Sequence, residues 1–238
     1  MFNLIKWVKK IVFPNTYSEE AYIEYLRKKK IIIGSNCKIW APMHTYIDDT
    51  KPYLIRIGDY CKITRGVTIL AHDYSLSALR RQFGGRSGGG TLPVSIGDNV
   101  FIGMNSTILM GTTIGNNCII GANSLVKGTF PDGSVICGNP ARVVQNTETM
   151  REKIDNRILK DAVRTAKAIK ANKGSAPTIE EMSDAYTWLY LPRTEEMLEK
   201  YRKFFDLSGD SFIDIKESFL NSSPMFESFD EFLDYCNL

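Results

Sequence analysis

The chain has 238 residues, enough for one large domain or two small ones, and its 30 lysines and arginines against 27 aspartates and glutamates leave a net charge of +3. That excess is too small to indicate a nucleic-acid partner, and no apolar run approaches the roughly eighteen residues that cross a membrane as a helix. No signal peptide with a cleavage site is visible, so we expect a cytoplasmic protein.

Residues 1–32 are predicted to form an N-terminal helical segment in two parts, 2–12 and 18–30, separated by Pro14. Ser18 is a plausible cap for the second part. The first part combines apolar residues and Trp7 with three lysines, a composition typical of helices that lie on a membrane surface. A weak peripheral membrane association through residues 2–12 therefore stays open. We favour packing on the solenoid or on a neighbouring subunit, because the segment has only about three turns.

The central region, residues 33–146, carries an aliphatic residue at every sixth position. The positions are Ile33, Ile39, Ile57, Ile63, Ile69, Ile96, Ile102, Ile108, Ile114, Ile120 and Val126. The gap from Ile39 to Ile57 is a multiple of six, which we interpret as two degenerate units that keep the phase. A period of six fits neither a helix nor simple alternation, and it is the period of hexapeptide β-helix repeats.

Each repeat unit has two further regular positions. The residue four places after the aliphatic one is small or β-branched, as at Cys37, Cys61, Val67, Val100, Ser106, Thr112, Cys118 and Ser124. We expect it to face inward at a narrower point, where a thiol acts as a small hydrophobe rather than a disulfide or metal ligand, which suits a reducing cytoplasm. The next residue after the aliphatic one is often glycine, which we interpret as a corner with positive φ.

An excursion loop, residues 72–93, interrupts the repeat. It contains Arg80 and Arg81 followed by the glycine-rich stretch 84–90, which lacks the Gly-Lys-Ser/Thr ending of a phosphate-binding P-loop. Two interpretations stay open. The loop is either a flexible excursion or a lid whose arginines contact an anionic ligand.

Residues 147–238 are predicted to be an α-helical extension. The stretch 151–173 is basic with an apolar stripe, Thr178 and Glu181 form a capping box that opens a second helix, and a third helix begins near Thr194. The tail 206–238 is acidic. Part of it resembles a calcium-binding loop, but Ser211 stands where the sharp turn requires glycine, so we predict no metal site.

A narrow solenoid filled with isoleucine has no interior pocket, so a site must lie at its loops or between chains. The chain has only two histidines, His44 and His72. His72 stands where the repeat breaks, and a neutral imidazole can remove a hydroxyl proton near neutral pH. Asp73 is not expected to orient His72, because adjacent side chains of an extended segment point to opposite faces. The partner that orients His72 is not evident.

Three segments resemble the hexapeptide-repeat acyltransferases: Ile-Gly-Asp-Asn-Val-Phe-Ile-Gly at 96–103, Ile-Gly-Ala-Asn-Ser at 120–124 and Gly-Asn-Pro-Ala-Arg-Val-Val at 138–144. The nearest groups are the maltose, galactoside and xenobiotic O-acetyltransferases. The stretch 68–76 around His72, with segments 22–28 and 229–233, is similar to capsular-polysaccharide and O-antigen O-acetyltransferases. The resemblance implies a mainly β fold, a left-handed parallel β-helix. It also implies a homotrimer with three active sites between subunits and an excursion loop that reaches the neighbour.

The resemblance also implies the chemistry. His72 would be the general base that activates a hydroxyl of a sugar or glycan acceptor for direct attack on acetyl-CoA. The positions that match the family's contacts to CoA are Met104, Ala122, Lys127 and Arg142. The family often has Trp where Phe101 stands, and its lysine lies one position from Lys127. On the acceptor side, the implied candidates are His44, Asp48, Asp49 and Tyr74.

Two alternatives to O-acetyl transfer stay open: an N-acetyltransferase acting on an amino sugar, and a non-catalytic trimeric assembly module whose helical tail binds partners. A γ-class carbonic anhydrase on the same scaffold is excluded, because its zinc requires three histidines and the chain has two.

Overall fold

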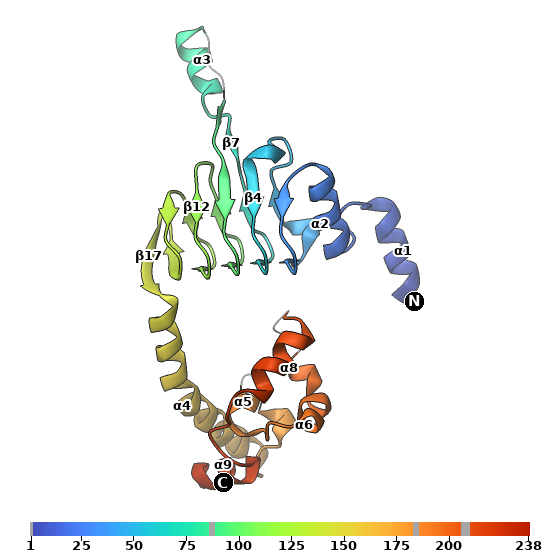
Figure 1. The fold of residues 1–238 in the computed structure, drawn as a ribbon, viewed down its shortest axis with the longest axis vertical. Helices are drawn as coiled ribbons and strands as arrows, with labels where there is room; N and C mark the ends of the chain where they lie inside the picture. The colour runs from blue at the N-terminus through green and yellow to red at the C-terminus, as the bar shows by residue number, and fades with distance from the viewer. Residues whose placement is uncertain (1, 86–88, 183–185, 206–209) are drawn as a thin grey trace. The chain divides into compact units, whose positions relative to one another are not determined.

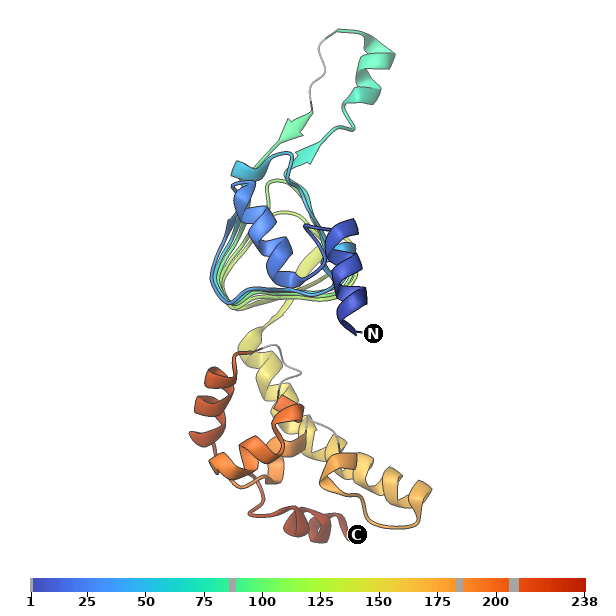
Figure 2. The ribbon, with the colours of Figure 1, turned by 90° about the vertical axis from the view of Figure 1, so that its right-hand side faces the viewer.

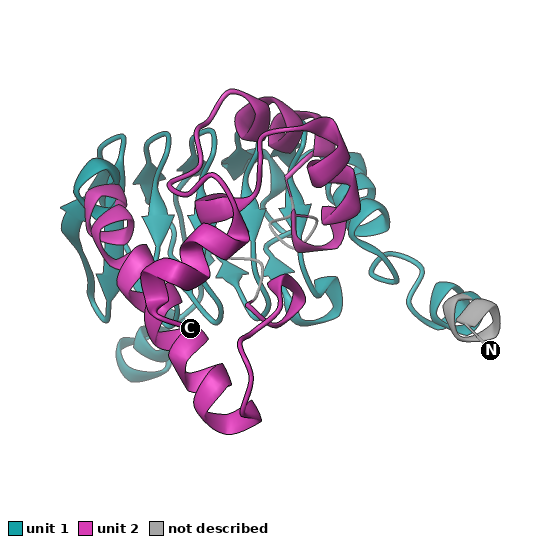
Figure 3. Ribbon diagram, turned by 90° about the horizontal axis from the view of Figure 1, so that it is seen from below, with its two compact units in different colours: residues 1–150 teal, residues 151–238 magenta. Residues whose placement is uncertain are grey.

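The computed structural model describes residues 2–85, 89–182, 186–205 and 210–238. The chain divides into two compact units, residues 1–150 and residues 151–238, which Figure 3 distinguishes by colour. Each unit has its own hydrophobic core.

Unit 1 is a stack of coils whose short strands form three parallel sheets. The first sheet contains β1 (Ile32–Ile33), β4 (Ile55–Ile57), β9 (Val94–Ile96), β12 (Thr113–Ile114) and β15 (Thr129–Phe130). The second contains β2 (Lys38–Ile39), β5 (Lys62–Ile63), β10 (Phe101–Ile102), β13 (Ile119–Ile120) and β16 (Ser134–Gly138), with β17 (Ala141–Asn146) antiparallel to β16. The third contains β3 (Tyr46–Ile47), β6 (Thr68–Ile69), β11 (Thr107–Ile108) and β14 (Leu125–Val126).

Seen along the stack, the coils superimpose as a triangle (Figure 2), and the predicted left-handed parallel β-helix is confirmed. All eleven aliphatic residues of the repeat are buried, and so are the eight small residues at the second inward position. Each coil therefore buries its apolar face against the coils above and below it.

The interpretation of the gap between Ile39 and Ile57 as two degenerate units is wrong. Only one strand, β3, lies in this gap, and its inward residue is Ile47. Two 3₁₀ turns, η1 (Pro42–His44) and η2 (Pro52–Leu54), take up the extra length. Because Ile33 pairs with Ile57, this coil takes 24 residues, whereas the regular coil from Ile96 to Ile114 takes 18.

The interpretation of the repeated glycines as positive-φ corners is also wrong. The left-handed residues stand three places after the aliphatic one, at Asn36, Tyr60, Gly66, Asn99, Asn105, Gly111, Asn117 and Asn123. The glycines directly after the aliphatic residue have ordinary backbone angles, and close stacking explains them. A Cβ on Gly103 would lie 2.5 Å from the backbone nitrogen of Ala122 in the next coil.

Helices cover one end of the stack. α1 (Phe2–Val12) is followed by α2 (Glu19–Lys28), whose predicted cap, Ser18, accepts a hydrogen bond from the backbone of Ala21. α2 lies across the first coil (Figure 1), and its Tyr22 and Leu26 join the core of the solenoid.

The excursion loop leaves the solenoid as a two-stranded ribbon. β7 (His72–Asp73) pairs with β8 (Gly90–Thr91) in antiparallel fashion, and α3 (Ser77–Phe83) carries Arg80 and Arg81 beyond it (Figure 1). Residues 86–88 of the glycine-rich stretch lie outside the described residues. The loop thus contains a helix, which neither sequence interpretation included.

Unit 2 is helical. Its elements are α4 (Thr147–Lys173, which begins in unit 1), η3 (Ile179–Glu181), α5 (Thr187–Tyr190), α6 (Glu195–Lys200), α7 (Arg202–Phe205), α8 (Phe212–Leu220) and α9 (Phe229–Cys236). The capping box of Thr178 and Glu181 is present but opens a 3₁₀ turn. The predicted third helix corresponds to α6, which begins directly after Thr194 and has the Thr194 side chain as its cap. Asp206 and Ser208 of the calcium-loop-like stretch lie outside the described residues. Among the described helices, none is both long and apolar enough to cross a bilayer.

Candidate active site

His72 stands at the point where the chain leaves the solenoid. It follows the buried Ala71 at the end of the third sheet and pairs with Thr91 at the base of the excursion. The returning chain is tied there by a hydrogen bond of 3.2 Å from the backbone N–H of Leu92 to the carbonyl oxygen of Ala71. The His72 side chain is 16% exposed, so it can meet a ligand while most of its ring is held by the protein.

The partner of His72 is Asp48. The distance from Nδ1 of His72 to Oδ2 of Asp48 is 2.5 Å, and the Asp48 side chain is completely buried. Asp48 directly follows β3, which pairs with β6, so the stacking of two coils brings the residues together. Because a carboxylate only accepts, Nδ1 carries the proton in the neutral ring and Nε2 keeps its lone pair.

The carboxylate of Asp48 is held from several directions. Oδ1 accepts hydrogen bonds from the backbone N–H of Thr50 at 3.0 Å and from its hydroxyl at 2.6 Å. Oδ2 also accepts from the backbone N–H of Ala71 at 3.1 Å. Burial acts to raise the pKa of Asp48, but the hydrogen bonds from Thr50, His72 and Ala71 outweigh it, so the pKa lies below its ordinary value. Asp48 is therefore a fixed negative charge at neutral pH.

Two neighbours complete the surroundings of the imidazole. The ring of Tyr74 lies 4.4 Å from that of His72, tilted by 42°, and Tyr74 is half exposed. Asp73 turns away from His72 and accepts a hydrogen bond of 2.8 Å from the backbone N–H of Ser75. As expected for adjacent residues in an extended segment, Asp73 does not orient His72.

The acceptor-side candidates separate in the structure. The resemblance implied that Asp48 contacts the acceptor, but its carboxylate has no exposed surface. Its position fits the orientation of His72 instead. Asp49 accepts a hydrogen bond from the hydroxyl of Tyr25 and lies 3.5 Å from Nζ of Lys29. His44 is exposed at the end of η1, and Tyr74 contacts His72.

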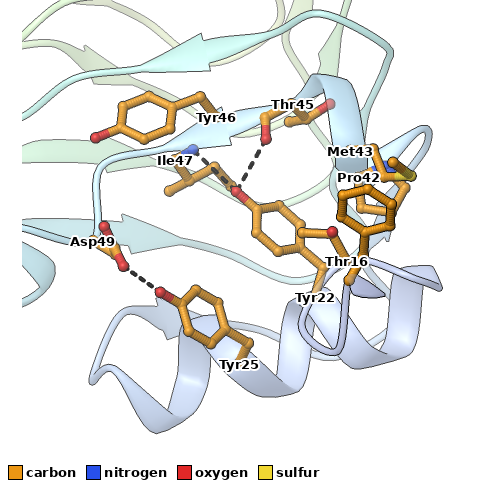
Figure 4. Close-up of a pocket in the computed structure, with 10 residues that line it drawn as sticks. Thr16, Tyr22, Tyr25, Pro42, Met43, Thr45, Tyr46, Ile47 and Asp49 are labelled. Atoms are coloured by element: carbon orange, nitrogen blue, oxygen red, sulfur yellow. Dashed lines mark hydrogen bonds between the residues drawn. The ribbon is translucent and has the colours of Figure 1, made fainter. Parts of the chain in front are cut away.

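A pocket of about 320 Å³ lies between α2 and the first coil (Figure 4). Its lining residues are Phe13, Thr16, Tyr22, Tyr25, Pro42, Met43, Thr45, Tyr46, Ile47 and Asp49. Burial raises the pKa of Tyr22 to about 12; its hydroxyl donates to the carbonyl oxygen of Thr45 at 3.1 Å and accepts from the N–H of Ile47 at 3.2 Å. Burial and the nearby groups Asp48, Asp49 and Tyr74 all act to raise the pKa of Tyr46. The ring of Tyr46 therefore lies within electrostatic range of Asp48, the partner of His72.

The four predicted CoA contacts fall into separate groups. Met104 and Ala122 follow β10 and β13 on consecutive coils, where the carbonyl oxygen of Met104 accepts from Asn123 at 2.8 Å. Lys127 directly follows β14, an edge strand of the third sheet. The hydrogen bonds from Ser75, and after them the charge of Lys127, act to lower the pKa of Asp73. Arg142 is exposed on β17.

Comparison with known proteins places this geometry in a family. Residues 93–127 match the family described as "Hexapeptide repeat of succinyl-transferase". Protein CapG of Staphylococcus aureus is 40% identical over 129 residues, which cover 54% of this chain and 73% of CapG. YvoF of Bacillus subtilis (strain 168) is 38% identical over 103 residues, which cover 43% of this chain and about half of YvoF, 54%. A maltose O-acetyltransferase from Clostridium difficile 630 is 28% identical, with 53% of this chain and 75% of that chain covered and a TM-score of 0.38.

The repeat and the relatives that share it define the class of the protein as an acyltransferase. The extent of the match to CapG shows that the chain belongs to the hexapeptide-repeat acyltransferase family.

Proposed function

We propose that the protein is an acetyl-CoA-dependent O-acetyltransferase that modifies a hydroxyl of a sugar or surface polysaccharide. The observation that carries the proposal is the dyad of Asp48 and His72 at the break in the solenoid. A buried carboxylate on Nδ1 leaves Nε2 as the proton acceptor, the arrangement that general-base catalysis requires. The resemblance of residues 68–76 to capsular-polysaccharide and O-antigen O-acetyltransferases supports a glycan acceptor.

The proposed reaction proceeds in two proton transfers without an acyl-enzyme. Nε2 of His72 takes the proton of the acceptor hydroxyl while the oxygen attacks the thioester carbonyl carbon of acetyl-CoA. The C–S bond of the tetrahedral intermediate then breaks, and the thiolate of CoA leaves as the imidazolium returns the proton to sulfur. The charge of Asp48 stabilises the imidazolium between these steps, and backbone N–H groups would stabilise the oxyanion.

On the acceptor side, we propose that the glycan lies against Tyr74 and extends toward the pocket that Tyr46 borders. Exposed aromatic rings offer flat apolar surfaces for sugar rings, and both tyrosines retain hydroxyls that can hydrogen-bond to sugar. Asp49 and His44 are further polar candidates on the same coil. The carboxylate of Asp49 already accepts a hydrogen bond from the hydroxyl of Tyr25, so in the proposed complex it accepts from Tyr25 and from the acceptor at the same time.

On the donor side, we propose that acetyl-CoA lies along the coils with Met104 and Ala122 beside the pantetheine arm. Lys127 and Arg142 would pair with the phosphates as charge-assisted donors. Since the four residues fall into separate groups on one chain, we propose a cytoplasmic homotrimer in which adjacent solenoids together form the donor groove. Light scattering should then give a mass about three times the 26.9 kDa of one chain.

The test is release of CoA from acetyl-CoA against a panel of glycan and amino-sugar acceptors, corrected for hydrolysis. His72→Ala should lower the chemical step by about 10²-fold or more, the usual size of a general-base contribution, while acetyl-CoA affinity by calorimetry stays nearly unchanged. His44→Ala removes the other histidine and is the control for the chemical step, because a residue on the acceptor side should change KM for the acceptor and leave that step nearly unchanged. Unchanged turnover in His72→Ala would refute the mechanism, and transfer confined to amino groups would make the protein an N-acetyltransferase.

A further inference from the structure

The first helix leaves an apolar face in solvent. Trp7 and Ile11 of α1 are 61% and 59% exposed, and Val8, Val12 and the following Phe13 are exposed as well. Val8, Ile11 and Val12 stand at helical spacings of three and four, so they lie on one side of the helix. Although Phe13 borders the pocket of Figure 4, these five side chains are not buried against the solenoid, so the first of the two packings that we favoured is not found, and packing on a neighbouring subunit stays a prediction.

The segment that carries this face contains only neutral and basic residues. Lys9 and Lys10 lie in the last turn of α1, and the sequence from Met1 to Ser18 contains three lysines and no acidic residue. The ammonium group of Lys10 lies 5.7 Å from the ring centre of Tyr17, so an aromatic side chain stands beside the positive charge. This end of unit 1 therefore offers an apolar strip with a positive border.

From this combination we infer that α1 binds the surface of an anionic lipid membrane, with Trp7, Val8, Ile11 and Val12 inserted among the acyl chains and the lysines on the headgroups. Charge complementarity selects this occupant, because an anionic surface matches a segment that carries only positive charges. A tryptophan on an amphipathic helix favours the same depth, where its apolar ring is buried and its N–H stays near water. With eleven residues, α1 is too short to cross the bilayer and would lie in its surface.

The test is co-sedimentation of the full chain with vesicles of phosphatidylcholine alone and with vesicles that contain phosphatidylglycerol, at low and at moderate salt. We expect at least tenfold tighter binding to the anionic vesicles. The double substitution Lys9→Glu and Lys10→Glu should weaken that binding by about 25-fold or more, since one basic residue at an anionic surface contributes about fivefold. Ile11→Ser should weaken it by about tenfold.

Matched controls lie in unit 2. Ile213→Ser removes an apolar side chain that is 77% exposed, more than Ile11, and Lys160→Glu with Lys170→Glu reverses two exposed charges. Both variants should bind within about twofold of wild type. Circular dichroism checks that each variant is folded. No difference between the two lipid mixtures, or equal losses in the control variants, would overturn the inference. The inference would also be overturned if Ile11→Ser changed the mass measured by light scattering and left lipid binding unchanged. That result would show that α1 packs on a second copy of the chain.

Discussion

Replacement of Asp48 by asparagine tests whether the buried carboxylate of Asp48 supports His72 as the general base. The asparagine side chain would keep the size of the aspartate but would remove the charge that faces Nδ1 of His72 at 2.5 Å. Hydrogen bonds to charged groups contribute about 1.5 to 3 kcal/mol, so kcat should fall about 10- to 150-fold if the interaction strengthens as the imidazolium forms. The KM for acetyl-CoA should change little, because Asp48 is buried and cannot contact the donor.

The same substitution affects stability, and pH separates the two effects. The pKa of folded Asp48 lies below its ordinary value of 3.8, so its carboxylate stabilises the fold above that pH and the contribution is lost as the pH falls through the folded-state value. Well above this range the carboxylate of Asp48 is ionised in the folded and the unfolded chain, so kcat is compared at pH 8, where its contribution to stability is complete and each variant is checked to be folded. Asp49→Asn is the matched control for kcat, because Asp49 bonds to Tyr25 and Lys29 rather than to His72 and its proposed acceptor contact would change KM for the acceptor. An unchanged kcat in folded Asp48→Asn, or an equal loss in Asp49→Asn, would refute the positioning role.

Two further predictions concern the scaffold and are measured by urea unfolding. Gly103→Ala should lower the free energy of unfolding by more than about 3 kcal/mol, because the new Cβ would lie 2.5 Å from the backbone of Ala122. Gly111→Ala should lower it by about 1 to 2 kcal/mol, because Gly111 has a φ of +79° and its new Cβ would meet only the movable side chain of Leu92. A larger loss in Gly111→Ala would show that backbone conformation, rather than close stacking of the coils, requires glycine at these positions. Wild type should lose roughly 2 to 3 kcal/mol more stability than Tyr22→Phe between pH 10 and pH 12, because the pKa of Tyr22 rises to about 12 on folding and the unfolded tyrosine ionises first. An equal loss in both proteins would show that Tyr22 is not the group responsible.

The β-helix could be predicted because its pattern is local. An inward aliphatic residue and an inward small residue recur in every unit, and both positions are buried throughout the stack. The role of the glycines could not be read in the same way, since the atoms that exclude a Cβ belong to the next coil. Asn99, Asn105, Asn117 and Asn123 do carry a signal that could have located the true corners, because asparagine is the residue that most often joins glycine in the left-handed region.

The helical regions show a similar division. Ser18 was identified as a cap and Thr194 as the neighbourhood of a helix start, because the start of a helix depends on a few adjacent residues. Both side chains accept a backbone hydrogen bond from the first turn. The capping box at Thr178 formed but led into a 3₁₀ turn, because the length and type of the helix after a cap depend on packing that the motif does not contain. The sequence likewise could not predict whether α1 buries its apolar face. A hydrophobic pattern shows that the face exists and does not show which surface covers it.

The candidate site illustrates the same limit. His72 stood out because the repeat breaks beside it, but Asp48 was one of several polar residues in a coil whose register was misread. The strict period of six places Thr45 at the inward position, whereas the aliphatic Ile47 occupies it and Asp48 follows directly after the strand. Because β3 pairs with β6, Ile47 lies beside Ile69, and the residues that follow these two strands meet at one edge. Ile47 was the available signal: once it defines the register, the same stacking that buries the isoleucines brings a carboxylate to the histidine.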